Sequence, residues 1–201
     1  MEIKEMEKET AILFIQKYHY SKIMPRLTKH YLGVFDDNLL LGVFTLGWGT
    51  QPLQTIQKIF NNHKLTTKDY FEIGKMCFLP EMNETGYFGC QVISLLVKWM
   101  KQNTDCLFLY TLADGIMGKP GFVYQASNFR YLGSFKTLVY LDKNTGEKIH
   151  PRSAKTLLEE NAKIDGVAKR FWLTYDFCKE KSIDVIQGVM FRYNCRLHCR
   201  K

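Results

Sequence analysis

The sequence predicts a mixed α/β fold, with a single mixed sheet flanked by helices. Three observations support this class. Two apolar segments rich in branched residues, His30–Phe35 and Leu39–Trp48, flank an Asp-Asp-Asn turn and so predict a β-hairpin. Cys106–Leu112 is short and wholly apolar, which is typical of a buried strand. Cys90–Lys101 carries apolar residues at helical spacing, so strand and helix patterns alternate along the chain.

The remaining elements follow from the same periodicities. Glu5–Tyr18 is expected to be an amphipathic helix, because Ala11, Ile12, Ile15 and Tyr18 recur at helical spacing. Further along, the patterns predict a short helix at Gln51–Phe60, a central strand at Tyr70–Leu79, a loop at Pro80–Gly89, a strand at Ser134–Leu141, a helix at Ser153–Ala162, an ambiguous segment at Phe171–Lys179 and a final strand at Ile183–Tyr193.

Length and composition indicate one domain over residues 1–201, with a core at about 5–153 and a C-terminal extension that adds a helix and a strand. The apolar runs are shorter than the ~20 residues that a membrane-spanning helix needs, so no membrane association is expected. No apolar signal-peptide core follows the charged N-terminus. The six cysteines are scattered, as reduced thiols would be, which favours a cytoplasmic protein.

The chain is basic, with a formal net charge of +8. Cations interleaved with aromatic residues favour a polyanionic partner, most plausibly nucleic acid, although a solvated basic surface is the alternative. The residues expected to contact the phosphates of this polyanion are Lys22, Arg26, Lys29, Lys119 and Arg152.

The segment Ala113–Gly133 is the strongest candidate for a site. Asp114 stands where the apolar strand should end, and a loop with three glycines follows it. Beyond the loop, four polar or aromatic residues share the spacing i, i+3, i+4 and i+7, and so would lie on one helix face: Tyr124, Ser127, Asn128 and Tyr131. Open α/β sheets bind their ligands beyond the carboxyl ends of strands.

Each of these side chains has two interpretations. Asp114 could act as a general base, orient an amino group or hold a metal, or it could cap the turn onto Gly115. Asn128 could pair with the edge of adenine, or it could be a buried amide that satisfies the backbone. Tyr124 could stack on a flipped base or relay a proton, or it could be a core aromatic.

His19 and Tyr20 follow the first helix directly. His19 suits a general base or metal ligand, against the alternative of a helix-capping histidine. Glu72 and Lys75 lie three residues apart on the central strand, which predicts opposite faces and favours Glu72 as the pocket residue. Trp48 is a further aromatic that could stack on a base at the mouth of the pocket.

Five segments carry a family resemblance: HYSKIMP at His19–Pro25, GVFTLGWGTQP at Gly42–Pro52, EIGKMCF at Glu72–Phe78, the Ala113–Gly133 block and EKIHPRS at Glu147–Ser153. In this order they resemble the Mom-type adenine-modification proteins of bacteriophages, a divergent branch of the GNAT-like acyltransferases. The resemblance implies a GNAT-like sheet whose two central strands splay apart. It also implies transfer of an acyl or carbamoylmethyl-type group to the adenine N6 amine of DNA, which would protect the DNA from restriction in a bacterial or phage-infected cell.

The resemblance further implies an acyl-coenzyme A or related donor, held by Phe78 and by Asn83, Thr85, Gly86 and Gly89 of the following loop. That loop lacks the usual basic residue and tight glycine pair, and Phe129 replaces the tyrosine that often stands four residues before a glycine such as Gly133. Both departures fit an unusual donor. Iron held by His19, Asp114 or a nearby tyrosine is also suggested for the Mom type. The sequence itself contains no standard metal motif, because Cys195, His198 and Cys199 lack the spacing of a zinc finger.

Two other functions remain open. One is a coenzyme A-dependent N-acyltransferase that acts on a protein or small-molecule amine. The other is a non-enzymatic module that binds nucleic acid.

Overall fold

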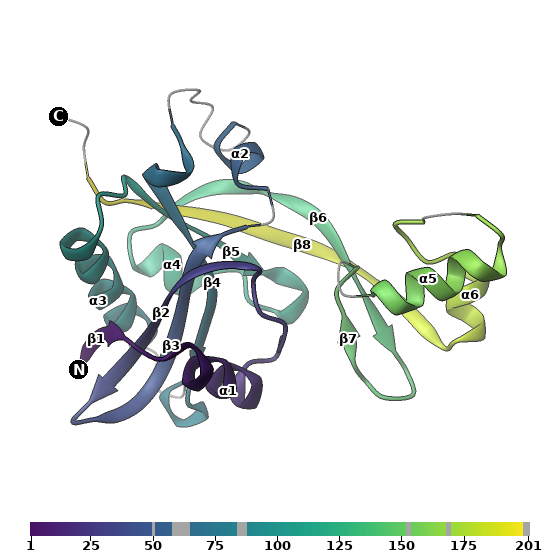
Figure 1. The fold of residues 1–201 in the computed structure, drawn as a ribbon, viewed down its shortest axis with the longest axis horizontal. Coiled ribbons are helices and arrows are strands. Elements are labelled where there is room, and N and C mark those ends of the chain that lie inside the picture. Colours follow the sequence, from purple (N-terminus) through teal and green to yellow (C-terminus); the bar gives the residue numbers. More distant parts are fainter. Residues whose placement is uncertain (50, 58–64, 84–87, 152–153, 168–169, 199–201) are drawn as a thin grey trace. The chain divides into compact units, whose positions relative to one another are not determined.

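The structure is a computed structural model that describes residues 1–49, 51–57, 65–83, 88–151, 154–167 and 170–198 (Figure 1). The chain forms two compact units. The first contains Met1–Ala113, Pro120–Gly133 and Phe191–Lys201, and the second contains Asp114–Lys119 and Ser134–Met190. The prediction of a single domain therefore stays a prediction.

The strands form one sheet in the order β1-β2-β3-β4-β5-β8-β6-β7. Their bounds are β1 Glu2–Glu5, β2 Leu27–Asp36, β3 Leu39–Trp48, β4 Tyr70–Phe78, β5 Phe108–Asp114, β6 Arg130–Asp142, β7 Lys148–Ile149 and β8 Ile183–Arg196. Strands β1 to β4 pair antiparallel, whereas β4 and β5 are parallel. The sheet is therefore mixed, as the sequence predicts.

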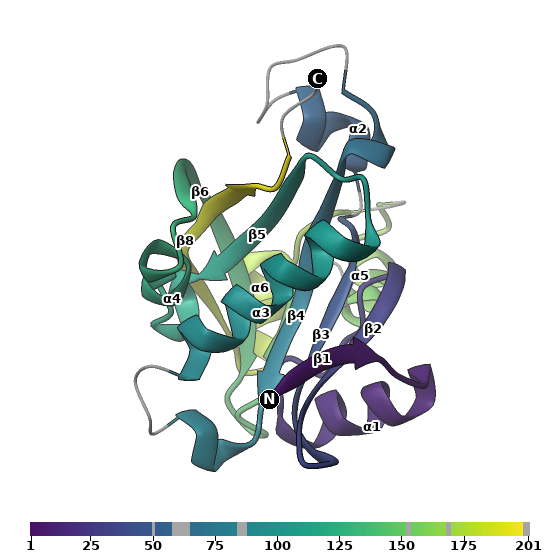
Figure 2. The same ribbon diagram turned by 90° about the vertical axis from the view of Figure 1, so that its left-hand side faces the viewer.

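Two helices of the first unit cover opposite faces of the strands β2 to β4 (Figure 2). Helix α3, Phe88–Asn103, buries Val92, Ile93 and Leu96 in a core that contains Phe44 of β3. Helix α1, Lys8–Tyr18, buries Ala11 and Ile15 against Val43 and Cys77. Because neighbouring residues of a strand point to opposite faces, Val43 and Phe44 place α1 and α3 on the two sides of the sheet. The prediction of a sheet flanked by helices is confirmed.

The first unit also contains the short helices α2, Pro52–Thr55, and α4, Phe122–Ala126, and single 3-10 turns at Thr67–Asp69 and Pro80–Asn83. The second unit contains α5, Lys155–Ile164, α6, Tyr175–Glu180, and a 3-10 turn at Gly115–Met117. A small core between these two helices includes Leu173, Phe177 and Tyr140. Among the described residues, no helix is long and apolar enough to cross a membrane.

The hairpin prediction is confirmed by its turn, where Asp37 and Asn38 have φ angles of 44° and 71°. Positive φ at both central residues gives the turn a twist that matches paired strands. The first helix begins later than predicted, at Lys8, because Glu2–Glu5 forms strand β1 beside β2. That pairing is a long-range contact, and the polar sequence of β1 carries no alternation that could have indicated a strand.

We expect Leu96→Ala to lower the free energy of unfolding by about 2–5 kcal/mol, since Leu96 is fully buried in the α3 core and its truncation leaves a cavity. Leu13→Ala is the matched control, because Leu13 of α1 is 68% exposed. Urea denaturation followed by circular dichroism measures both. Equal losses in the two variants would contradict this packing of α3.

Candidate active site

Strands β4 and β5 part from one another in the middle of the sheet. Their pairing begins at Tyr70 and Phe108 and, among the described residues, ends at Ile73 and Thr111. Strand β4 continues to Phe78 beyond this point. The predicted splay of the central strands is confirmed, and the second half of β4 forms one wall of the gap.

A β-bulge lies at the point where the strands part. Thr45 pairs with Lys75 and Leu46 pairs with Ile73, so Gly74 is the extra residue of β4. Ile73 packs in the α3 core, whereas Lys75 reaches Ser21 on the α1 side. The bulge reverses the alternation of side chains, and it places Glu72 and Lys75 on the same face. The prediction of opposite faces was wrong, because it assumed an unbroken strand.

Lys75 anchors the segment that follows α1. Its ammonium group donates hydrogen bonds to the carbonyl oxygen of Ser21 at 2.8 Å and to the hydroxyl of Ser21 at 3.0 Å. The residue is only 9% exposed, and a buried ammonium is costly unless hydrogen bonds satisfy it. A Cβ atom at Gly74 would lie 2.7 Å from Cγ of Pro25, so the bulge lets the same segment approach β4 closely.

His19 and Tyr20 lie directly before this anchor. The backbone N–H of Ser21 donates to Nδ1 of His19 at 2.9 Å, which places the proton of the neutral imidazole on Nε2. The two rings stack with centroids 4.4 Å apart, and Tyr20 is 45% exposed. His19 also ends helix α1, since its backbone N–H donates to the carbonyl of Ile15. The predicted pair is therefore brought together, with Nε2–H as a hydrogen-bond donor.

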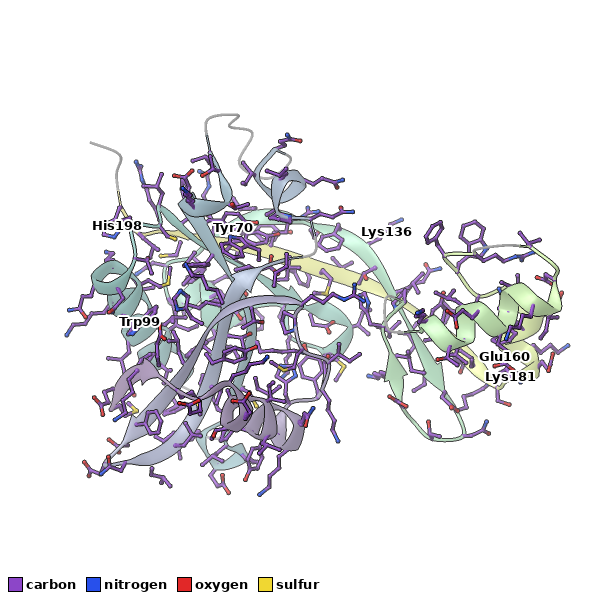
Figure 3. All side chains as sticks on the ribbon, in the orientation of Figure 1. Tyr70, Trp99, Lys136, Glu160, Lys181 and His198 are labelled. Carbon is purple, nitrogen blue, oxygen red and sulfur yellow. The ribbon has the colours of Figure 1, made fainter. Side chains whose placement is uncertain are left out.

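Glu72 lies opposite Tyr110 of β5, on the face that Lys75 shares. Burial, and then the charge of Glu72, raises the pKa of Tyr70 to about 12 (Figure 3 labels Tyr70). Burial and Glu72 also raise the pKa of Tyr110, while Arg192 of β8 opposes that shift. Both phenols therefore stay protonated at neutral pH and can donate hydrogen bonds. Sequence reasoning missed Tyr110 and Arg192. A tyrosine inside an otherwise apolar strand was the available signal for the first.

The predicted helix face after the glycine loop does not exist. Helix α4 ends at Ala126, Asn128 adopts a left-handed conformation with φ of 61°, and Tyr131 belongs to β6. The prediction of one shared face for Tyr124, Ser127, Asn128 and Tyr131 was wrong. It required a helix that continues to Tyr131, whereas α4 has only five residues. Asn is one of the few residues that tolerates the left-handed region at a helix end.

Tyr124 and Asn128 have contrasting surroundings. Tyr124 is 6% exposed, its ring packs against Phe129 and Tyr193, and burial raises the pKa of its hydroxyl. Asn128 is exposed at the end of α4. These are the positions of a core aromatic and of a turn residue. Their predicted roles in catalysis stay predictions.

Asp114 caps the 3-10 turn that follows β5. Its carboxylate accepts hydrogen bonds from the backbone N–H groups of Ile116 at 3.0 Å and Met117 at 3.4 Å. Its predicted role as a base also stays a prediction. Asp114 belongs to the second unit together with Lys119, which is exposed.

The predicted DNA contacts of the first unit lie close together in sequence. Lys22 and Arg26 are exposed in the segment after Ser21, and Lys29 is exposed at the start of β2, with its ammonium 5.5 Å from the centroid of Phe71. Trp48 is held in place, because its indole N–H donates to the carbonyl oxygens of Thr67 at 2.8 Å and Tyr70 at 3.1 Å. Arg152 lies outside the described residues.

Two of the residues predicted to hold the donor, Phe78 and Gly89, lie in tightly packed surroundings. A Cβ atom at Gly89, in the first turn of α3, would lie 2.7 Å from the Val123 side chain of α4, so the two helices are in contact there. Phe78 is buried edge-to-face against Phe44 and Phe88. Thr85 and Gly86 lie outside the described residues, as does the side chain of Asn83. Among the described residues, no three His, Cys, Asp or Glu side chains gather as metal ligands, and the suggested iron site stays a prediction.

We expect Glu72→Gln to lower the pKa of Tyr70 from about 12, because the substitution removes the negative charge that opposes phenolate formation. Spectrophotometric titration of tyrosine measures the shift, with Tyr70→Phe to assign the transition. Burial raises the folded-state pKa above the usual ~10 of an unfolded chain. The resulting stabilisation is full below pH ~10 and is lost as the pH rises toward 12. An unchanged titration curve in Glu72→Gln would place Glu72 away from Tyr70.

Asn128→Gly separates the backbone role of Asn128 from a chemical role. Glycine adopts positive φ without strain, so this variant should keep the stability of the parent, whereas Asn128→Val should lose about 1–2 kcal/mol. Thermal unfolding measures both variants. If Asn128→Gly is stable but loses the activity of the parent, the amide itself has a function. If it keeps that activity, Asn128 acts through its backbone conformation.

Comparison with known proteins identifies relatives. A model of the Mom protein family matches residues 1–200. The chain is 29% identical over 150 residues to "Methylcarbamoylase mom" of Escherichia phage Mu, covering 68% of this chain and 57% of that protein. The chain therefore spans less than two thirds of the length of this curated relative.

Solved acetyltransferases are similar in outline. Spermidine N-acetyltransferase from Vibrio cholerae, in complex with CoA and spermine, is 11% identical, with 97% of this chain and 94% of that chain covered and a TM-score of 0.49. Aminoglycoside 6'-N-acetyltransferase from Enterococcus faecium is 10% identical, with 100% and 99% covered and a TM-score of 0.46. We infer neither fold nor function from these scores. The match along nearly the whole chain, together with the motifs at the splayed strands, shows that the chain belongs to the Mom protein family.

Proposed function

We propose that this chain transfers a carbamoylmethyl-type group to the N6 amine of adenine in DNA and so masks recognition sites of restriction nucleases. Membership of the Mom family supports the reaction class. The observation that supports particular residues is the segment His19–Arg26, which Lys75 anchors through Ser21. It presents a stacked histidine–tyrosine pair beside exposed cations, over the half of β4 that carries Lys75.

The acceptor base must leave the DNA stack before its amine can react, which costs a few kcal/mol. Tyr20 is exposed and stacked on His19, so it offers a flat surface that would replace part of the lost stacking. Nε2–H of His19 can donate to a ring nitrogen of adenine. Lys22, Arg26 and Lys29 would neutralise the flanking phosphates, and each such contact steepens the salt dependence of binding.

The adenine amine is a weak nucleophile, because its lone pair is delocalised into the ring. A carboxylate that accepts one N6 proton favours attack, and Glu72 is the acid on the shared face. Bond formation then joins N6 to the methylene carbon of the transferred group, the donor's leaving group departs with the electron pair, and one N6 proton passes to the carboxylate. The protonated phenol of Tyr110 interacts with both the charge of Glu72 and the guanidinium of Arg192, so a hydrogen-bond donor and a cation lie in the same part of the site.

Nucleoside mass spectrometry of plasmid DNA from cells that express the chain tests the proposal. Deoxyadenosine should gain one carbamoylmethyl group. Glu72→Gln should reduce the modified fraction by about 10²–10⁴-fold, the range for loss of a proton acceptor. Lys75→Met should also reduce the modified fraction, because it removes the anchor of the segment that carries His19. Lys75→Arg should recover part of the modification, whereas Leu13→Ala, at an exposed position, should leave it unchanged.

Three results would contradict this account. Unmodified DNA together with an acetylated amine in the presence of acetyl-coenzyme A would favour an acyltransferase that acts on a protein or small molecule. Unmodified DNA with tight, salt-sensitive binding would favour a non-enzymatic module. Full modification of DNA by the Glu72→Gln variant would show that Glu72 is not the proton acceptor. Asp114→Asn would then be the next variant to measure.

A further inference from the structure

The segment that joins α1 to β2 exposes apolar side chains between cations (Figure 1). Tyr20 is 45% exposed, Ile23 is 54% exposed and Leu27 is 44% exposed. Lys22 and Arg26 stand between them in the chain, and both are exposed. Isoleucine is among the residue types that are most often fully buried, and exposed apolar side chains that gather within a polar rim mark interaction sites. The alternation indicates a partner with both apolar surface and negative charge.

The backbone on both sides of Ile23 is fixed to the first unit. Before it, the carbonyl and hydroxyl oxygens of Ser21 accept hydrogen bonds from Lys75 of β4. After it, Met24 packs against the core beside α1, and Pro25 lies against the bulge of β4. The side chain of isoleucine is β-branched, so it has little rotational freedom to lose on contact. The segment therefore holds an apolar tip at a defined place.

The charge around this tip is positive. The chain contains no aspartate or glutamate between Glu9 and Asp36. Glu9 lies in the first turn of α1 and Asp36 at the end of β2, so both stand at the far ends of the elements that flank the segment. On the neighbouring strands, Glu5 is paired with His30 at 2.7 Å, and Glu72 is the proposed proton acceptor. Four cations occur in the same interval: Lys17, Lys22, Arg26 and Lys29. Such a balance favours a polyanion.

The proposed function creates a gap in the DNA close to this segment. Extrusion of the adenine leaves an empty space in the base stack, and the extruded base stays attached to its own sugar. The pocket and the empty space must therefore lie near one another. Ile23 follows Tyr20 so closely in the chain that their Cα atoms are at most ~11 Å apart. Proteins that open or kink DNA insert apolar side chains such as isoleucine between base steps.

We propose that Ile23 is a wedge that fills the space left in the base stack by the extruded adenine, while Lys22 and Arg26 contact the flanking phosphates. The proposal rests on the proposed function, which supplies the extruded base. Ile23 is about half exposed in the free protein, so its burial between bases offsets part of the cost of extrusion. The wedge acts on duplex DNA alone, because a single strand has no continuous stack to fill.

The test follows the fluorescence of 2-aminopurine, an adenine analogue that brightens when it leaves the base stack, in a duplex with random base pairs on both sides of it. The full parent chain should raise the fluorescence. Ile23→Ala should shift the equilibrium toward the stacked base by about 5- to 50-fold, the range for three carbon atoms that lose between half and all of their burial. Ile23→Leu should keep most of the rise, because it keeps the apolar volume.

Binding to a single strand separates a wedge from a general contact. Fluorescence anisotropy with a fluorescein-labelled single strand of the same composition should give equal affinities for Ile23→Ala and the parent. Lys22→Ala should weaken binding to both forms of DNA and should lower the slope of log affinity against log salt by about one, because it removes one phosphate contact.

Leu39→Ala is the matched control, since Leu39 is 61% exposed on the hairpin of the same unit and loses the same number of carbon atoms. Its fluorescence change should equal that of the parent, and equal urea midpoints show that the variants are folded. The proposal is overturned if the parent leaves the fluorescence unchanged, if Ile23→Ala matches the parent on the duplex, or if Ile23→Ala weakens binding to the single strand equally. Loss of binding to phosphatidylglycerol vesicles by Ile23→Ala, with the duplex measurement unchanged, would also overturn it and identify a lipid surface as the partner.

Failure of the wedge and failure of the proposed function give different results. Absence of modified deoxyadenosine in cells that express the parent chain contradicts the proposed function. The fluorescence measurement needs no group donor, so it still decides whether Ile23 opens duplex DNA. Modified DNA together with an unchanged fluorescence rise in Ile23→Ala contradicts the wedge alone.

Discussion

The buried ammonium group of Lys75 is the interaction on which the rest of the candidate site depends. The carbonyl and hydroxyl oxygens of Ser21 accept its hydrogen bonds and offset the cost of its burial, and so it ties strand β4 to the segment after α1. That tie holds Ser21 where its N–H sets the tautomer of His19, against which Tyr20 stacks. One buried charge therefore orients an aromatic pair of which Tyr20 is exposed to solvent.

The splayed sheet supplies a second constraint. The pairing of β4 and β5 ends at Ile73 and Thr111 among the described residues, and α4 lies directly against the first turn of α3 through Val123 and Gly89. The side of the gap near α1 carries the polar groups instead, with Glu72 and Lys75 both on that face. Glu72 and Lys75 therefore lie on the face of β4 opposite α3.

Most of the fold could be predicted from periodicity, because the hairpin, β4, α3 and β5 each bury a continuous apolar face. Strand β1 could not, since its polar residues form a strand only by pairing with β2. In the candidate site, the adjacency of His19 and Tyr20 followed from the sequence. The common face of Glu72 and Lys75 did not, because a β-bulge at Gly74 is a property of the paired strands.

The sequence by itself determined the family, the mixed sheet and the basic character of this protein, because these depend on local patterns and composition. Tertiary structure decided which polar residues meet. It buried Tyr124, turned Asn128 into the left-handed end of a short helix, and brought Arg192 from the last strand beside Tyr110. Such contacts join residues far apart in the chain, and their geometry depends on bulges, helix ends and strand order that no local pattern of side chains specifies.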